Sequence, residues 1–121
     1  MKKVLVVDDS LTIRMQVRMS LRPEKYEVLE AENGQDGLNI IEQNEDLSFI
    51  ILDIDMPVMN GIEMLEKVRE NKSSSHIPVF IMTTNNAANK ISEAKSKGAT
   101  GFIVKPFTPK QLSAIITKFA S

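Results

Sequence analysis

The chain has 121 residues, of which 42% are hydrophobic and 26% are charged, and its formal net charge is −1. This size and composition fit one globular domain, residues 1–121, and we expect no second, output domain. The balanced charge has no basic excess that would point to nucleic acid or an anionic membrane as a partner, and the absence of cysteine excludes disulfides and thiolate catalysis.

The first predicted strand covers residues 3–7, a nearly continuous aliphatic run that is typical of a strand buried on both faces. The run stops at the acidic pair Asp8–Asp9, too early for a signal peptide or a membrane span. We therefore expect a cytoplasmic protein.

The next segment, residues 11–21, has an apolar residue at every second position, and periodicity alone would favour a strand. We nevertheless interpret it as a helix, because Ile13, Val17 and Leu21 also repeat at the helical spacing of four. Asp9 or Ser10 is a natural N-cap, and a crossover is needed to join two parallel strands.

Residues 27–31 are more polar and predict a strand at an edge of the sheet. An expected turn at Asn33–Gly34 then leads into a helix over residues 35–43. Residues 49–52 repeat the buried-strand pattern, and a helix follows in which Ile62, Leu65 and Val68 share one face.

Residues 79–82 predict the fourth strand, and residues 87–97 predict a helix that Gly98 caps at its C-terminus. Residues 102–104 predict a short fifth strand. Thr108 and Gln111 form a capping-box pattern around Pro109, which predicts the last helix, over residues 108–119. Such alternation of strands and helices indicates a parallel sheet with helices on both faces, and ligands of such sheets bind at the carboxyl ends of the strands.

Polar side chains stand at the carboxyl ends of four of these strands. They are Asp8–Asp9, Asp53, Thr83–Thr84 and Lys105–Pro106. Neighbouring strands are only about 4.8 Å apart, so these side chains can meet. Each of them alone has an ordinary explanation as a helix cap, a turn residue, a strand end or a surface loop, but their joint placement favours a site.

Such a site suits phosphoryl transfer. Clustered carboxylates are unfavourable unless a cation offsets them, and Mg²⁺ prefers a few carboxylates together with phosphate oxygens. An aspartate can act as a nucleophile toward phosphorus, giving an aspartyl phosphate. Lys105 and Thr83 are the right types of residue to neutralise and bind the phosphoryl oxygens.

Three segments resemble the response-regulator receiver family, and its standalone chemotaxis-type members in particular. They are residues 6–14 (VVDDSLTIR), 52–61 (LDIDMPVMNG) and 101–107 (GFIVKPF). The resemblance covers almost the whole chain. It implies an α/β, flavodoxin-like, doubly wound sheet of five parallel strands in the order 2-1-3-4-5, with five helices.

The resemblance also implies roles for the acidic residues. Asp53 would be the phosphoacceptor and a ligand of Mg²⁺. Asp9 would bind the ion directly, and Asp8 would bind it directly or through water. Asp55 would contribute its backbone carbonyl to the ion.

Further roles follow from the same resemblance. Lys105 would pair with Asp53 and then with the phosphoryl group, and the Lys105–Pro106 bond would be cis. The Thr83 hydroxyl would turn toward the phosphoryl group, and Phe102 would be the switching aromatic ring. The chain would accept its phosphoryl group from a sensor histidine kinase or a small phosphodonor and assist its own phosphorylation and dephosphorylation, without being an enzyme.

Three departures from the family pattern matter. Phe102 lacks the hydroxyl of the more usual Tyr, which predicts a bias toward a buried ring. Thr84 is bulkier than the small residue that the family prefers, and it could restrict access to the phosphoryl group. Asp55 adds a carboxylate beside the site, where it should tune dephosphorylation together with Asn85.

The expected partners are the kinase and a downstream protein target, with a flagellar motor switch as the leading candidate. The target would bind a monomer through residues 87–97, Phe102 and residues 108–119, and phosphorylation would shift a two-state equilibrium. The basic side chains of Lys90, Lys95 and Lys97 could steer an acidic partner or form a solvated face.

Two alternatives stay open on the sequence. The chain could be an interaction module that keeps this fold without using phosphate. Alternatively, Asp53 and Asp55 after a hydrophobic strand resemble the nucleophile motif of haloacid-dehalogenase-type phosphatases, although that motif normally opens its domain and the chain is short for that fold.

Overall fold

Strands and helices alternate along the whole chain in the computed structural model, which describes residues 1–56, 59–84 and 88–120. The strands are β1 (Lys2–Val7), β2 (Tyr26–Ala31), β3 (Leu47–Asp53), β4 (Val79–Thr83) and β5 (Gly101–Val104). The helices are α1 (Leu11–Ser20), α2 (Gly34–Gln43), α3 (Gly61–Glu70), α4 (Ala88–Ser96) and α5 (Pro109–Phe119). Each predicted element is present, with bounds that differ from the prediction by one or two residues at most ends.

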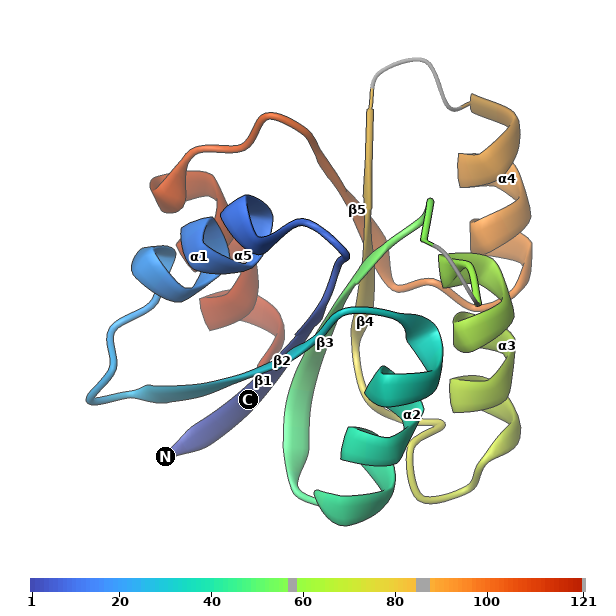
Figure 1. Cartoon of the computed structure of the whole chain (residues 1–121), viewed down its shortest axis with the longest axis horizontal. Helices are drawn as coiled ribbons and strands as arrows, with labels where there is room; N and C mark the ends of the chain where they lie inside the picture. The colour runs from blue at the N-terminus through green and yellow to red at the C-terminus, as the bar shows by residue number, and fades with distance from the viewer. Residues whose placement is uncertain (57–58, 85–87, 121) are drawn as a thin grey trace.

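The strands form one parallel sheet in the order β2-β1-β3-β4-β5. Helices α1 and α5 cover one face, and α2, α3 and α4 cover the other (Figure 1). This confirms the doubly wound fold and the predicted strand order. Within the described residues, no helix combines the length and apolarity needed to cross a membrane.

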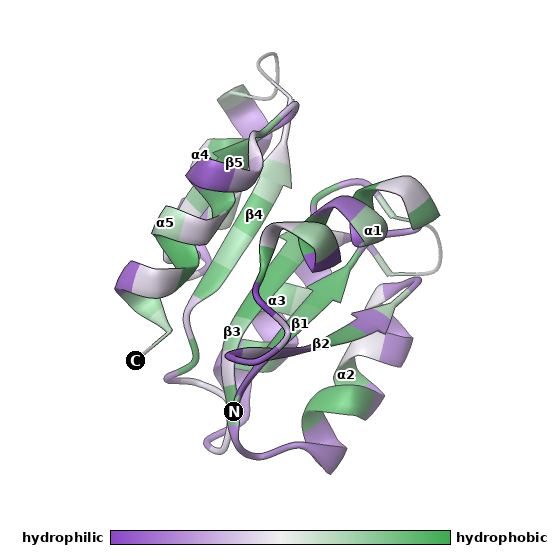
Figure 2. Ribbon diagram, turned by 90° about the vertical axis from the view of Figure 1, so that its left-hand side faces the viewer, coloured by the Kyte–Doolittle hydropathy of each residue, from purple (hydrophilic) through white to green (hydrophobic). Residues whose placement is uncertain are grey.

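Alternate residues of the central strands feed two hydrophobic clusters, one on each face of the sheet. In β1, Leu5 and Val7 belong to one cluster, and Val4 and Val6 belong to the other. All four side chains are fully buried, which explains the unbroken aliphatic run. Figure 2 shows the hydrophobic colouring of the central strands, whereas β2 is mixed, as expected of an edge strand.

The alternating segment is helical, as predicted, and its two sets of apolar residues face opposite ways. Val17 and Leu21 are buried, and Ile13 packs against the same cluster. Met15 and Met19 are exposed on the outer side of α1. The strict alternation therefore arises from two helical stripes, one inward and one outward, rather than from a strand.

Side-chain caps set where several helices begin. Ser10 caps α1 by accepting a hydrogen bond from the Ile13 amide, and Thr108 and Gln111 form the predicted capping box of α5. The chain bends at Asn33, as expected, but α2 begins one residue earlier than predicted. Asn33 is the N-cap of α2, with its side-chain oxygen 2.9 Å from the Asp36 amide nitrogen, and Gly34 is already helical, because Asn competes well for the free amides of a first turn.

The strand register brings the polar strand ends to one level. Val7 pairs with Leu52, so Asp8 and Asp53 follow side by side at the ends of β1 and β3. Thr83 pairs with Val104, which places Lys105 at the same edge. The side chains singled out in the sequence therefore gather at the carboxyl end of the sheet.

Gly61, the first residue of α3, packs directly on the backbone of this edge. A Cβ atom at this position would overlap the Asp53 carbonyl oxygen and lie 2.9 Å from the Ile54 Cα, so neither neighbour could yield without moving the strand end. We expect Gly61→Ala to lower the free energy of unfolding by about 1–3 kcal/mol, the usual cost of overpacking. Chemical denaturation measures this change.

Ser92→Ala is the matched control, because Ser92 is exposed within α4. It should leave stability unchanged or raise it slightly, since alanine is the better helix former. A Gly61→Ala variant as stable as Ser92→Ala would contradict the close packing of α3 on Asp53.

Candidate functional site

Three carboxylates cluster at the carboxyl edge of the sheet. One oxygen from each of Asp8, Asp9 and Asp53 lies within 4.8 Å of the other two. Asp8 and Asp53 are buried and Asp9 is exposed, so the cluster opens to solvent on one side. Ligands around an octahedral Mg²⁺ are about 3–4.2 Å apart, so small side-chain rotations would let these oxygens share one ion.

Lys105 provides the positive charge nearest to the two buried carboxylates. Its Nζ atom lies 3.1 Å from Asp53 Oδ1 and 3.3 Å from Asp8 Oδ2. The other Asp8 oxygen accepts a hydrogen bond from the Ser10 amide at 2.8 Å, which fixes that carboxylate beside the start of α1. The peptide bond between Lys105 and Pro106 is cis.

The charges at the site shift the pKa values of Asp53 and Lys105. Burial and the neighbouring Asp8 charge raise the pKa of Asp53, and the hydrogen bond from Lys105 only partly opposes them. Burial alone would lower the pKa of Lys105, but the two carboxylates outweigh it and raise that pKa. Ionisation of Asp53 is therefore unfavourable in the folded protein, and a bound cation would make it more favourable.

The two proposed switch residues lie on the neighbouring strands β4 and β5. Thr83 is buried, and its hydroxyl donates to the Thr84 carbonyl oxygen at 3.2 Å, so it does not bind Asp53 in this structure. Phe102 is partly buried and packs against the hydrophobic cluster of the α3 face. Thr84 is exposed at the end of β4, and Asn85 lies outside the described residues.

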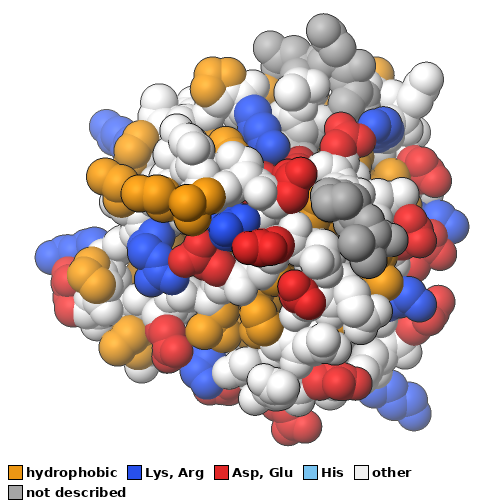
Figure 3. All heavy atoms as spheres, in the orientation of Figure 1, with side chains coloured by type: hydrophobic (Ala, Val, Ile, Leu, Met, Phe, Trp, Pro, Cys, Tyr) orange, Lys and Arg blue, Asp and Glu red, His pale blue; other side chains and the backbone are white. Residues whose placement is uncertain are grey.

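The Asp55 side chain lies outside the cluster and pairs with Lys90 of α4. This contact was missed in the sequence, where Lys90 was grouped with Lys95 and Lys97 as a basic face. Lys97 in turn pairs with Glu66 of α3 at 3.7 Å, so two of these lysines are bound to carboxylates of this chain. Figure 3 shows acidic and basic side chains interleaved across the side of the molecule that faces the viewer.

Comparisons with known proteins agree with this geometry. The sequence profile of the response regulator receiver domain matches residues 4–117. A chemotaxis protein CheY homolog of Campylobacter jejuni is 40% identical over 111 residues, which are 91% of this chain and 85% of that protein. Chemotaxis protein CheY1 of Helicobacter pylori is also 40% identical, over 91% of this chain and 90% of its own length.

A solved structure gives the same result. The chemotaxis protein CheY4 of Vibrio cholerae is 38% identical, covers 98% of each chain and superposes with a TM-score of 0.90. A plant relative, the two-component response regulator ORR11 of Oryza sativa, is 36% identical over 95% of this chain and 78% of its own.

The raised pKa of Asp53 predicts that its charge destabilises the metal-free protein. Its carboxyl is protonated in both the folded and unfolded states well below the ordinary pKa of about 4. Stability is then lost as the pH rises from that value through the folded-state pKa, because the unfolded chain ionises first. With a chelator present, we expect Asp53→Asn to melt at a higher temperature than the parent at pH 7, and the difference to vanish at low pH. Thermal unfolding measured against pH tests this.

Asp46→Asn is the control, because the exposed Asp46 is paired with Lys3 and its pKa is lowered, chiefly by that hydrogen bond. The sign should therefore reverse, with any loss of stability present at neutral pH and absent in acid. An Asp53→Asn variant less stable than the parent at pH 7 would refute the assigned cost of this carboxylate.

Proposed function

This chain belongs to the family of response regulator receiver domains, and from this we infer that it signals by accepting a phosphoryl group on Asp53 with the help of Mg²⁺. One observation carries the proposal. Asp53, at the end of β3, lies within a cluster of three carboxylates and has the Lys105 ammonium 3.1 Å from one of its oxygens. This arrangement supplies a nucleophile, a place for a cation and a fixed positive charge.

In the proposed reaction an Asp53 carboxylate oxygen attacks phosphorus. The bond from phosphorus to the donor breaks, and the imidazole of a kinase phosphohistidine or the acetate of acetyl phosphate leaves with the bonding electrons. Lys105 stays beside Asp53 and binds a phosphoryl oxygen. Hydrolysis reverses the modification, because water attacks phosphorus and releases inorganic phosphate and the Asp53 carboxylate.

The carboxylates of Asp9 and Asp53 and the backbone carbonyl of Asp55 would hold Mg²⁺, with Asp8 binding directly or through water. The ion neutralises the phosphoryl oxygens when bound. The donor set supports this assignment, since oxygen ligands of this kind suit a hard divalent cation and Lys105 alone leaves the pKa of Asp53 raised.

We propose that phosphorylation switches the surface formed by α4, β5 and α5. The Thr83 hydroxyl would leave the Thr84 carbonyl oxygen and donate its hydrogen bond to a phosphoryl oxygen instead. The Phe102 ring would respond by changing how closely it packs against its neighbours. Phe102, Val104 and Phe107 already line a hollow of about 390 Å³ on this surface. Because Phe102 has no hydroxyl, we expect its ring to favour a buried position. Asp55 and Asn85 would tune how long the phosphoryl group persists.

Receiver domains of this family are signalling proteins rather than turnover enzymes. We propose that this one is a cytoplasmic, monomeric regulator that takes its phosphoryl group from a sensor histidine kinase. The CheY relatives favour chemotaxis and a flagellar motor switch as the target. Membership of the receiver family argues against the phosphatase hypothesis. The remaining alternative is an interaction module that does not use phosphate, and an experiment must exclude it.

A small phosphodonor with Mg²⁺ tests the phosphoacceptor directly. We expect acetyl phosphate to add one phosphoryl group to the parent, detected as a mass gain, and to add none without Mg²⁺ or to Asp53→Asn. Asp46→Asn, at an exposed position away from the site, should be modified like the parent. An unmodified parent, or a modified Asp53→Asn, would favour the rival interaction module or another acceptor.

Binding to a flagellar motor switch protein tests the proposed target. We expect the phosphorylated parent to bind more tightly than the unphosphorylated parent, because phosphorylation favours one state of the α4-β5-α5 surface. Titration calorimetry measures both affinities. Equal affinity of the two forms would contradict a motor-switch role, but it would leave the phosphoacceptor assignment valid.

A further inference from the structure

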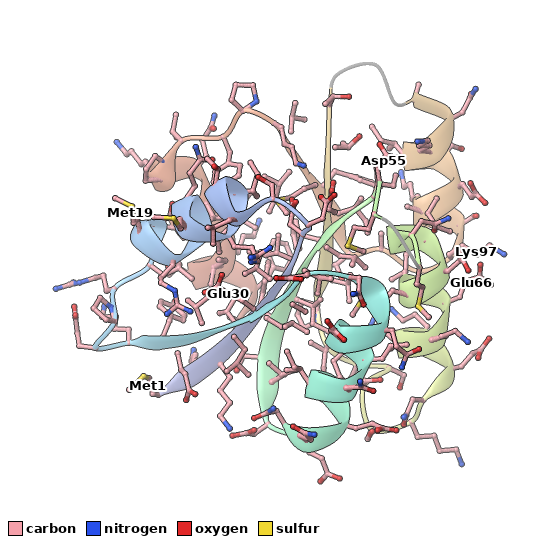
Figure 4. All side chains as sticks on the ribbon, viewed as in Figure 1. Met1, Met19, Glu30, Asp55, Glu66 and Lys97 are labelled. Carbon is pink, nitrogen blue, oxygen red and sulfur yellow. The ribbon has the colours of Figure 1, made fainter. Side chains whose placement is uncertain are left out.

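An ion pair links the loop after Asp53 to α4. The Lys90 ammonium, in the first turn of α4, donates a hydrogen bond to the carboxylate of Asp55, which lies two residues beyond the proposed phosphoacceptor. Figure 4 shows Asp55 at the end of β3, on the side of the sheet that α4 covers. The pair therefore joins two segments that flank the phosphoryl site from different parts of the chain.

Helix α4 has few contacts with the core, so its ion pairs are prominent among the contacts that it makes. Of the α4 residues that the structure describes, Ala94 alone is buried. A second ion pair, Lys97 with Glu66, ties the far end of α4 to α3 (Figure 4). The two lysines thus attach the two ends of one helix, but only Lys90 reaches a residue next to Asp53.

Stability is a poor explanation for the Lys90 contact. The Asp55 and Lys90 side chains are 71% and 49% exposed, and exposed ion pairs contribute little to folding. Asp55 nevertheless touches the site through its backbone, since its amide acts on the Asp53 carboxyl and opposes the rise in that pKa. Because Asp55 lies only two residues beyond Asp53, the position and charge of its side chain affect what can approach Asp53.

An incoming phosphodonor is an anion, and it must reach Asp53 past whatever charge stands at the opening. An unpaired Asp55 carboxylate could rotate toward that opening and repel the donor. A carboxylate held against α4 by an ammonium group is both displaced from the opening and neutralised. The effect should be largest for the most highly charged donors and should weaken as salt is added.

We propose that Lys90 is a positioning residue for phosphorylation, which holds and neutralises the Asp55 carboxylate so that an anionic phosphodonor can approach Asp53. This role rests on the proposed function. The transfer itself is unchanged: an Asp53 oxygen–phosphorus bond forms, the donor's bond to phosphorus breaks, and the leaving group departs with the electron pair. Neither Asp55 nor Lys90 exchanges a proton.

The test compares initial phosphorylation rates of the parent, Lys90→Met, Lys90→Arg, Asp55→Asn and the double variant Asp55→Asn/Lys90→Met, with Mg²⁺ present. Each is measured with acetyl phosphate and with phosphoramidate, which carries less net negative charge. We expect Lys90→Met to lower the rate of phosphorylation by acetyl phosphate on the order of threefold, which is the effect of one partly screened charge. The rate with phosphoramidate should fall less. Lys90→Arg should restore the rate.

The double variant isolates the action through Asp55. Lys90→Met should have little effect when introduced together with Asp55→Asn, since no carboxylate is then left to position. Lys97→Met is the matched control, because it breaks the other ion pair of the same helix and should leave both rates unchanged. The ratio of the two donor rates is insensitive to loss of folded protein, which would lower both rates equally.

Two results would overturn this role while leaving the phosphoacceptor assignment intact. One is an unchanged rate for Lys90→Met, and the other is an equal slowing by Lys90→Met with and without Asp55→Asn. A parent that takes no phosphoryl group would instead overturn the proposed function, and this role with it.

Discussion

Mutual repulsion among Asp8, Asp9 and Asp53 is the constraint on which the rest of the structure depends. Three carboxylates whose oxygens lie within 4.8 Å of one another would not gather without a compensating charge. Lys105 supplies part of it, yet the pKa of Asp53 stays raised because burial and Asp8 outweigh that lysine. The site is consequently short of positive charge, and this shortage is the basis of the proposal that a divalent cation binds there together with a phosphoryl group.

The parallel sheet maintains this arrangement at the edge where it is needed. Buried aliphatic residues fix the register of β1, β3 and β4, and the register brings Asp8 and Asp53 level. Gly61 lets α3 begin against the backbone of Asp53, and the Ser10 amide holds one oxygen of Asp8. The acidic cluster is thus supported by backbone packing, while the exposed ion pair between Lys90 and Asp55 links the loop after β3 to α4.

Much of the fold could be predicted because its signals are local and repeat along the chain. Aliphatic runs mark the buried strands, and caps such as Thr108 mark helix starts. The convergence of Asp8, Asp53 and Lys105 followed from strand ends alone, since parallel strands deliver their carboxyl ends to one edge. The order of the strands came from family resemblance, because periodicity does not say which strands are neighbours.

Other features depend on contacts that no local pattern encodes. Asn33 suits both a turn and an N-cap, so its residue type alone does not say at which residue α2 begins. The Thr83 hydroxyl can rotate between two acceptors, so its residue type does not give its direction. Lys90 and Asp55 are 35 residues apart and exposed, and neither the spacing nor the composition marks them as partners.

The most direct measurement of the central claim is to locate a divalent ion in crystals grown with Mn²⁺, an ion that shares the oxygen-ligand preference of Mg²⁺ and can be identified by its anomalous scattering. The account predicts one ion in contact with the carboxylates of Asp9 and Asp53. An ion bound elsewhere, with these carboxylates left apart, would contradict it.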